Sequence, residues 1–171
     1  MNICGYYPES INEGEGMRAV IFLSGCRHRC PGCFNPETWN FNYGDVFTPE
    51  RQREIIGEIA ANPLLDGLTL AGGDPFFSAG EAAGFIHELR ITLPGFPVWI
   101  YSGYTYEEIT AVPGSPEYQL LQQCQVLIDG RFVEELKDTT LPFRGSTNQR
   151  IIDVAASLTG PNVVFWQPSA L

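Results

Sequence analysis

The chain has 171 residues, the length of one ordinary domain, and its 44% hydrophobic and 18% charged residues are typical of a globular protein. Twenty acidic residues against ten basic ones give a formal charge of −10, which disfavours nucleic acid and anionic membranes as partners. The first residues lack the basic and apolar segments of a signal peptide, and no apolar run reaches the roughly twenty residues of a membrane span. We therefore expect a cytoplasmic protein in which the five cysteines do not form a disulfide framework.

Apolar runs separated by turn residues predict that strands and helices alternate along the chain. A helix is expected to begin at Thr48-Pro49, where threonine is a favourable N-cap, a second to begin after Ser78, and a third to lie near 118–123. The expected strands are 18–24, 67–71, 97–102 and 125–129, followed by two further apolar runs at 151–154 and 163–166.

This alternation predicts right-handed βαβ units and hence an α/β fold with a mostly parallel sheet. A complete eightfold barrel needs about 250 residues, so we expect an open sheet or a partial barrel. The loops at Cys26 and Gly72 each follow a predicted strand, and the carboxyl ends of parallel strands meet at one edge of the sheet. We therefore expect these two loops to lie together. No repeat or linker divides the chain, so residues 1–171 are expected to form a single domain.

Three of the five cysteines, Cys26, Cys30 and Cys33, have the spacing Cys-x3-Cys-x2-Cys. Thiolates are soft ligands that suit iron–sulfur clusters or zinc, and three of them leave one metal position open. Because Pro31-Gly32 disfavours a continuous helix through this segment, we expect a loop that wraps around a cluster.

Other interpretations of this loop remain open. A structural zinc site would need a fourth ligand, for which His28 is the nearest candidate. A redox pair would use Cys30 and Cys33 and would leave Cys26 without a role. Chance clustering of core cysteines is disfavoured because the residues between them are Arg, His and Pro. His28 and Arg29 themselves are expected to face solvent or a partner.

The cysteine spacing directly after a first strand resembles that of radical S-adenosylmethionine (SAM) enzymes. The string from Ser24 to Trp39 is similar to the glycyl-radical-enzyme activases, and 14–18 resembles their Gly-Pro-Gly-x-Arg segment, with Glu15 in place of proline. The resemblance extends from Tyr6 to Asp153 and leaves a tail, 155–171, outside it. Three strings resemble the activases of anaerobic ribonucleotide reductases in particular: 103–104, 126–132 and 144–149.

This resemblance implies a radical SAM domain, an incomplete βα barrel in which Cys26, Cys30 and Cys33 hold a [4Fe–4S] cluster. By itself Gly72-Gly73-Asp74-Pro75 is an ordinary tight turn. In this context it resembles the segment that receives the amino group of SAM, because a backbone without Cβ permits close approach and a carboxylate complements the charge. The residues that the resemblance implies for SAM binding are Gly32, Cys33, Phe34, Gly72, Gly73, Asp74 and Ser102.

Two of these residues could instead have a purely structural role. Phe34 would fill part of the core instead of contacting SAM, and Ser102 would only end the third strand. The remaining cysteines, Cys4 and Cys124, are expected to be inert small hydrophobic residues.

The resemblance also implies an activity and its partners. SAM would be reductively cleaved, and the resulting 5′-deoxyadenosyl radical would take a Cα hydrogen from one glycine near the C-terminus of an anaerobic ribonucleoside-triphosphate reductase large subunit. A one-electron donor such as a flavodoxin would supply the electron. No catalytic side chain is expected beyond the ligands of the cluster and of SAM, because the cofactors carry the chemistry.

Alternative functions within the superfamily are activation of another glycyl radical enzyme and a small-molecule reaction such as that of a deazaguanine-forming synthase. An alternative from another class is a non-enzymatic zinc or iron–sulfur module that acts as an adaptor.

Overall fold

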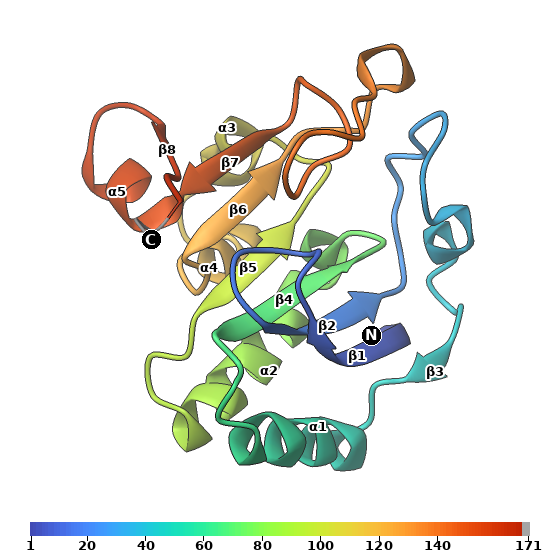
Figure 1. The fold of residues 1–171 in the computed structure, drawn as a ribbon, viewed down its shortest axis with the longest axis vertical. Helices are drawn as coiled ribbons and strands as arrows, with labels where there is room; N and C mark the ends of the chain where they lie inside the picture. Colours follow the sequence, from blue (N-terminus) through green and yellow to red (C-terminus); the bar gives the residue numbers. More distant parts are fainter. Residues whose placement is uncertain (169–171) are drawn as a thin grey trace.

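In the computed structural model, which describes residues 1–168, eight strands form one sheet in the order β3-β1-β2-β4-β5-β6-β7-β8 (Figure 1). The four predicted central strands are confirmed to within one residue at each end, and both later apolar runs contain strands. The last part of the expected tail, 169–171, lies outside the described residues. The strands are β1 (Asn2–Ser10), β2 (Arg18–Leu23), β3 (Asp45–Val46), β4 (Gly67–Gly72), β5 (Val98–Tyr101), β6 (Val126–Asp129), β7 (Arg150–Asp153) and β8 (Val164–Phe165).

The sheet is parallel only in its middle. β2, β4, β5 and β6 pair in parallel, whereas β1 and β3 at one edge and β7 and β8 at the other pair antiparallel. The expectation of a mostly parallel sheet is therefore wrong at the edges. The chain returns from β6 to β7 without a crossover helix, and a strand that returns in this way pairs antiparallel. No pairing joins β3 to β8, so the sheet of the described residues is open.

β1 is a strand that the apolar pattern did not predict, because its sequence mixes polar and aromatic residues and most of them are partly exposed. It pairs with β2 on one side and, through Asn2 and Ile3 only, with β3 on the other. Its register with β2 is irregular on both sides of the segment 5–7.

Helices cover one face of this sheet, and the main core lies between the two layers (Figure 1). Thr48 caps the first helix as predicted, since its side chain accepts a hydrogen bond from the Arg51 amide. Ser78 forms no such bond, because the short 3-10 helix 75–78 runs directly into the second helix. Within residues 1–168, no helix is both long and apolar enough to cross a membrane. The α-helices are α1 (Pro49–Ala61), α2 (Ala79–Thr92), α3 (Tyr106–Thr110), α4 (Pro116–Leu121) and α5 (Val154–Thr159).

The opposite face of the sheet is covered by loops and by the segment that follows α5. Its buried centre consists of Trp99, Val126, Ile128 and Ile151. The Trp166 ring lies 5.0 Å from the Trp99 ring, and the Trp166 amide donates to the Ile151 carbonyl at 2.9 Å. The tail that lies outside the sequence resemblance is therefore part of the fold as far as it is described.

Candidate functional site

The cysteine loop and the Gly-Gly-Asp-Pro turn lie together at one edge of the sheet, as the sequence predicts. β2 and β4 are parallel neighbours, with Leu23 opposite Gly72, so the segments that follow them emerge side by side. Two backbone hydrogen bonds join these segments: the Gly73 amide donates to the Leu23 carbonyl at 2.7 Å, and the Asp74 amide donates to the Gly25 carbonyl at 3.0 Å.

The two glycines of the turn are required by this close approach. Gly72 has a φ of +101°, and a Cβ on it would lie 2.5 Å from the Leu23 carbonyl oxygen. A Cβ on Gly73 would lie 2.7 Å from the Gly25 carbonyl oxygen. Contacts under 3.0 Å to rigid backbone force a shift, so the turn can rest on the start of the cysteine loop only with glycine at both positions.

The Asp74 carboxylate joins three segments at this edge. It is 1% exposed and accepts hydrogen bonds from the Ser102 hydroxyl at 2.9 Å and from the Gly103 amide at 2.9 Å, both just after β5. It also accepts from the Phe76 amide at 2.9 Å and thereby caps the 3-10 helix that follows. Asp74 and Ser102, which the sequence places in different loops, are thus brought into direct contact.

His28 is the fourth partner of this carboxylate. Its Nε2 lies 2.8 Å from Asp74 Oδ2, its side chain is 4% exposed, and its ring lies 4.6 Å from that of Tyr104. Arg131 Nε donates to His28 Nδ1 at 3.2 Å, so the ring proton is on Nε2 and points to the carboxylate. The expectation that His28 faces solvent or a partner is therefore wrong, whereas Arg29 is exposed as expected.

Gly103 provides the space for this ring. A Cβ at position 103 would collide with the imidazole of His28. The Gly103-Tyr104 string, which the sequence offers only as a resemblance, therefore has a local physical role: it accommodates the histidine and donates a backbone N–H to the same carboxylate.

The three clustered cysteines occupy one loop and are free thiols. Cys26 is buried, Cys30 and Cys33 are half-buried, and the Cys33 amide closes a turn onto the Cys30 carbonyl at 3.1 Å. Burial raises the pKa of the Cys26 thiol to about 11 and also raises that of Cys30, so a metal bound there must displace protons.

Within the part of the chain that is described, no set of three or more His, Cys, Asp or Glu side chains is arranged to hold a metal ion. A cluster does not require such a set, because each of its thiolates binds a different iron and the sulfurs stand farther apart. The other two cysteines lie elsewhere: Cys124 is buried in the core, and Cys4 donates to the Phe22 carbonyl.

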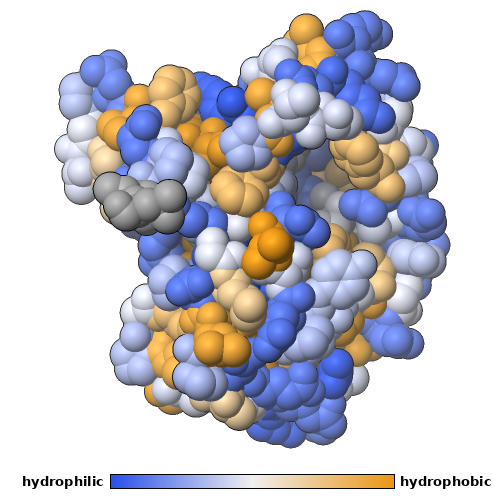
Figure 2. All heavy atoms as spheres, viewed as in Figure 1, coloured by the Kyte–Doolittle hydropathy of each residue, from blue (hydrophilic) through white to orange (hydrophobic). Residues whose placement is uncertain are grey.

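A cavity of about 480 Å³ opens beside the loop, at the carboxyl ends of β4 and β5. Figure 2 shows this face hollowed between the segment after β2 and the segment after β6. Phe34 lies at this cavity, 60% exposed, with its ring 5.2 Å from that of Phe132, so the alternative that Phe34 fills the core is wrong. Gly32, at a φ of +70°, is exposed nearby in the loop. The lining includes Glu13, Phe34, Gly72, Tyr101, Phe132 and Arg144.

The strings 126–132 and 144–149 form one rim of the cavity because they are tied together. The Gln149 side chain donates to the Gly130 carbonyl at 3.0 Å and accepts from the Gly145 amide at 2.9 Å. The Asn148 side-chain amide donates to the Arg131 carbonyl at 2.8 Å. The two strings thus support each other across a gap of eleven intervening residues.

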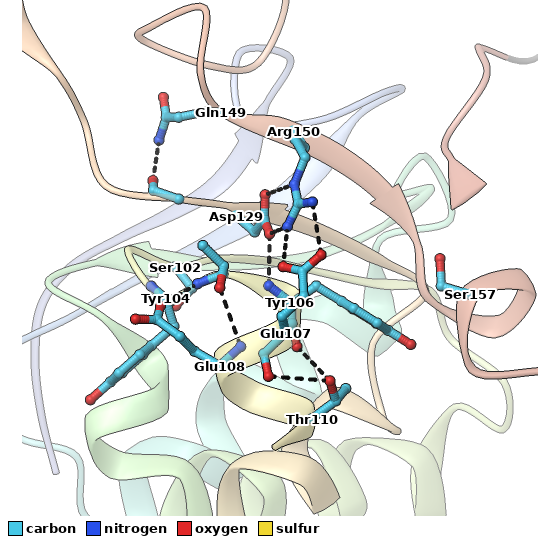
Figure 3. Close-up of polar contacts among 12 residues, drawn as sticks. Ser102, Tyr104, Tyr106, Glu107, Glu108, Thr110, Asp129, Gln149, Arg150 and Ser157 are labelled. Atoms are coloured by element: carbon cyan, nitrogen blue, oxygen red, sulfur yellow. Dashed lines mark hydrogen bonds and ion pairs between the residues drawn. The ribbon is translucent and has the colours of Figure 1, made fainter. Parts of the chain in front are cut away.

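Below this rim, Asp129 at the end of β6 is buried in an ion pair (Figure 3). Its carboxylate accepts from Arg150 and, at 2.7 Å, from the Tyr106 amide at the start of α3. The same guanidinium reaches the exposed Glu107 at 2.7 Å, which lowers the pKa of that carboxyl. The Asp129-Gly-Arg-Phe string therefore anchors its loop and does not point Asp129 at the cavity.

Comparison with known proteins bears on what this site holds. A family described as a 4Fe-4S single cluster domain matches residues 12–152. An anaerobic ribonucleoside-triphosphate reductase-activating protein of Escherichia coli (strain K12) is 38% identical over 152 residues, which cover 87% of this chain and 96% of the relative. This chain belongs to the family of anaerobic ribonucleoside-triphosphate reductase-activating proteins.

Members of that family with the same name in Haemophilus influenzae and in phage T4 are 35% and 33% identical. Each alignment covers 88% of this chain, and 97% and 93% of the respective relative. The family that the strings 103–104, 126–132 and 144–149 resemble is thereby confirmed. The matched 4Fe-4S domain ends at residue 152, before α5 and β8.

Proposed function

We propose that this chain activates an anaerobic ribonucleoside-triphosphate reductase by placing a radical on a glycine of that enzyme. One observation carries the proposal: the cysteine loop and the Gly72–Asp74 turn are hydrogen-bonded to each other at one sheet edge, in a chain that resembles reductase-activating proteins over most of its length. The name of those relatives supplies the partner, and the 4Fe-4S domain supplies the class of cofactor.

Cys26, Cys30 and Cys33 would hold a [4Fe–4S] cluster as thiolates. They fit this group because they are three soft ligands on one loop, half-buried or buried, without disulfide partners. When bound, the cluster and SAM supply a one-electron reductive cleavage that makes a 5′-deoxyadenosyl radical, which can take a hydrogen atom from glycine.

The neighbouring residues would bind and orient SAM. Gly72 and Gly73 present bare backbone at the edge, next to the loop that carries Cys26. Asp74 and Ser102 already form several hydrogen bonds within the chain, so we propose that they hold the loops of the site in position. The negative charge of Asp74 would also favour an ammonium group nearby. Gly32, Cys33 and Phe34 would contact SAM from the loop; Phe34 offers an exposed aromatic face.

The cavity between the loop and the 144–149 rim would receive SAM and the glycine segment of the reductase. Its volume of about 480 Å³ is in the usual range of ligand pockets, roughly 300–1,000 Å³. Aromatic side chains, among them Tyr101 and Phe132, line it and would exclude water from a reactive radical.

We also propose that the open sheet is the incomplete barrel of a single radical SAM domain that works in the cytoplasm, where thiols stay reduced. One continuous core joins residues from β1 to α5, which supports a single domain. An open sheet leaves one side accessible, as an extended peptide segment requires.

The test uses the full chain, reconstituted anaerobically with iron and sulfide. With SAM, a strong reductant and the reductase, electron paramagnetic resonance should show a doublet from the one remaining Cα hydrogen, and the doublet should collapse to a singlet with Cα-deuterated glycine. SAM cleavage without a radical on the reductase would point to another substrate. Iron and sulfide in equal amounts, but neither cleavage nor radical, would favour a binding module.

A further inference from the structure

A second cavity opens on the cysteine loop and shares no lining residue with the first. It measures about 1060 Å³, and Cys26 forms part of its wall. Arg27 and Arg29 of the same loop line it, together with the aromatic residues Trp39, Phe41 and Tyr43 from the following segment. The loop that carries the proposed cluster ligands is thus accessible from two separate hollows.

The two arginines make this surface unusual for a chain with a formal charge of −10. Both are exposed, and neither forms an ion pair within residues 1–168. By contrast, the exposed Arg53 pairs with Glu50. One carboxylate, that of the exposed Glu37, lines the cavity beside them, so the lining has a formal charge of +1.

Arg27 is held in place by aromatic rings. Its guanidinium lies 5.3 Å from the centroid of the Phe41 ring and 5.9 Å from that of Phe77. A cation stacked in this way keeps its charge available to a partner while its orientation is restricted. Arg29 has a φ of 51°, in the left-handed region that few side chains adopt, within the same loop.

We propose that the Arg27–Arg29 surface docks an acidic one-electron carrier protein, with a flavin or an iron–sulfur centre, that reduces the cluster. The inference rests on the proposed function, because reductive cleavage needs one electron per turnover from outside the chain. In the step itself the carrier loses one electron and the cluster gains it, and no bond is made or broken. The first cavity is assigned to SAM and the peptide, so the carrier needs the other access to the loop.

Charge complementarity favours this partner. An acidic carrier is repelled by most of the surface, because the net charge of the chain is strongly negative. It is attracted to the hollow beside Cys26, where Arg27 and Arg29 form no ion pair within residues 1–168. Such an arrangement raises the association rate at the productive face and lowers it elsewhere.

The experiment measures the rate of cluster reduction by stopped-flow absorbance in the reconstituted full chain, without SAM or reductase. Reduced flavodoxin is the carrier, and reduced methyl viologen, a small cation, is the second reductant. In Arg27→Gln/Arg29→Gln the second-order rate constant with flavodoxin should fall about tenfold at low salt, and the difference should shrink in 0.5 M salt, where screening is strong. The rate constant with methyl viologen should not fall.

Arg51→Gln/Arg53→Gln, with the same change of charge on α1, is the matched control and should reduce neither rate. An unchanged flavodoxin rate in Arg27→Gln/Arg29→Gln would overturn the proposal. An equal loss of rate with both reductants would also overturn it, because it would show that the arginines stabilise the cluster itself. An unchanged flavodoxin rate together with a loss of reductase affinity, measured in a separate binding titration, would overturn the proposal and assign the surface to the reductase. Because neither SAM nor reductase is present, failure here is distinct from failure of the proposed function.

Discussion

The imidazole of His28 and the carboxylate of Asp74 lie 2.8 Å apart, although 46 positions separate them in the sequence. Since His28 stands between two of the clustered cysteines and Asp74 ends the glycine turn, this hydrogen bond connects the two halves of the site. Arg131 extends the connection to the loop after β6.

Replacing this histidine should loosen the site. His28→Ala removes a donor from a buried carboxylate, which costs about 1–3 kcal/mol of unfolding free energy, and it should weaken SAM binding as well. His28→Gln keeps an N–H that can reach Asp74 and should restore most of both losses. Denaturant unfolding and anaerobic calorimetry measure the two effects. His87→Ala, at an exposed position of α2, is the control; equal damage in the Ala and Gln variants of His28 would refute the hydrogen-bond role.

Substitution of Gly73 should affect both loops. A Cβ at this position meets the Gly25 backbone close to Cys26, so a larger residue disturbs the cysteine loop as well as the glycine turn. Gly73→Ala should therefore lower thermal stability and the iron content after reconstitution. Gly57→Ala, in the exposed middle of α1 with nothing near its Cβ, should instead stabilise by about 0.5–1 kcal/mol. Normal iron content in Gly73→Ala would contradict this prediction.

The cysteines should separate into two groups. Alanine at Cys26, Cys30 or Cys33 should abolish the broad visible absorption of the reconstituted protein, because a cluster with two thiolates is not retained. Cys4→Ala and Cys124→Ala should keep it, since Cys124 is buried in the core and the Cys4 thiol is engaged with the backbone carbonyls at the end of β2. Iron and sulfide analysis of all five variants decides the assignment, which fails if Cys4→Ala loses the cluster and Cys30→Ala keeps it.

The segment after α5 should contribute to stability. Trp166→Ala removes an aromatic ring from the Trp99 face and should cost about 2 kcal/mol, a fall in Tm of about 4–8 °C for a chain of this length. The neighbouring Phe165 is 55% exposed, so Phe165→Ala should shift Tm much less. Similar shifts in the two variants, measured by calorimetry, would mean that the ring packing is unimportant.

Loss of Arg150 should destabilise the fold more than loss of a solvated arginine. Arg150→Met leaves the buried Asp129 carboxylate with only the Tyr106 amide, and the guanidinium is 29% exposed, so we expect a loss of about 2–4 kcal/mol, somewhat less than for a fully buried pair. Arg53→Met breaks a fully solvated pair with Glu50 and should cost at most about 1 kcal/mol. Chemical denaturation compares the two, and equal losses would show that burial is irrelevant.

The sequence predicts the position of the site better than its internal contacts. Parallel strands with loops at Cys26 and Gly72 place both loops at one edge by topology alone, and the structure confirms it. The role of His28 is not predictable in this way, because a histidine between two cysteines suggests a ligand or an exposed residue. His28 reaches Asp74 only because the two loops pack closely. This close packing depends on glycines that contact residues distant in the sequence.

The missed elements have local reasons. α3 carries the capping box Thr105–Glu108, a readable signal, but five residues of helix leave no apolar period to detect. β7 is expected as a strand, but spacing alone does not reveal its antiparallel direction. That direction follows from the return between Asp129 and Arg150, which contains only the short 3-10 helix Glu134–Leu136 and no crossover α-helix.

The irregular pairing of β1 has a consequence for how copies of this chain meet. Beyond its contact with β3, β1 borders the sheet with no further strand among the described residues, and a free strand edge can template association between molecules. Pro8 offers no N–H there, and the register breaks on both sides of 5–7 twist the backbone away from a flat ladder. The part of β1 that extends beyond β3 is therefore a poor template for pairing with another copy of this chain.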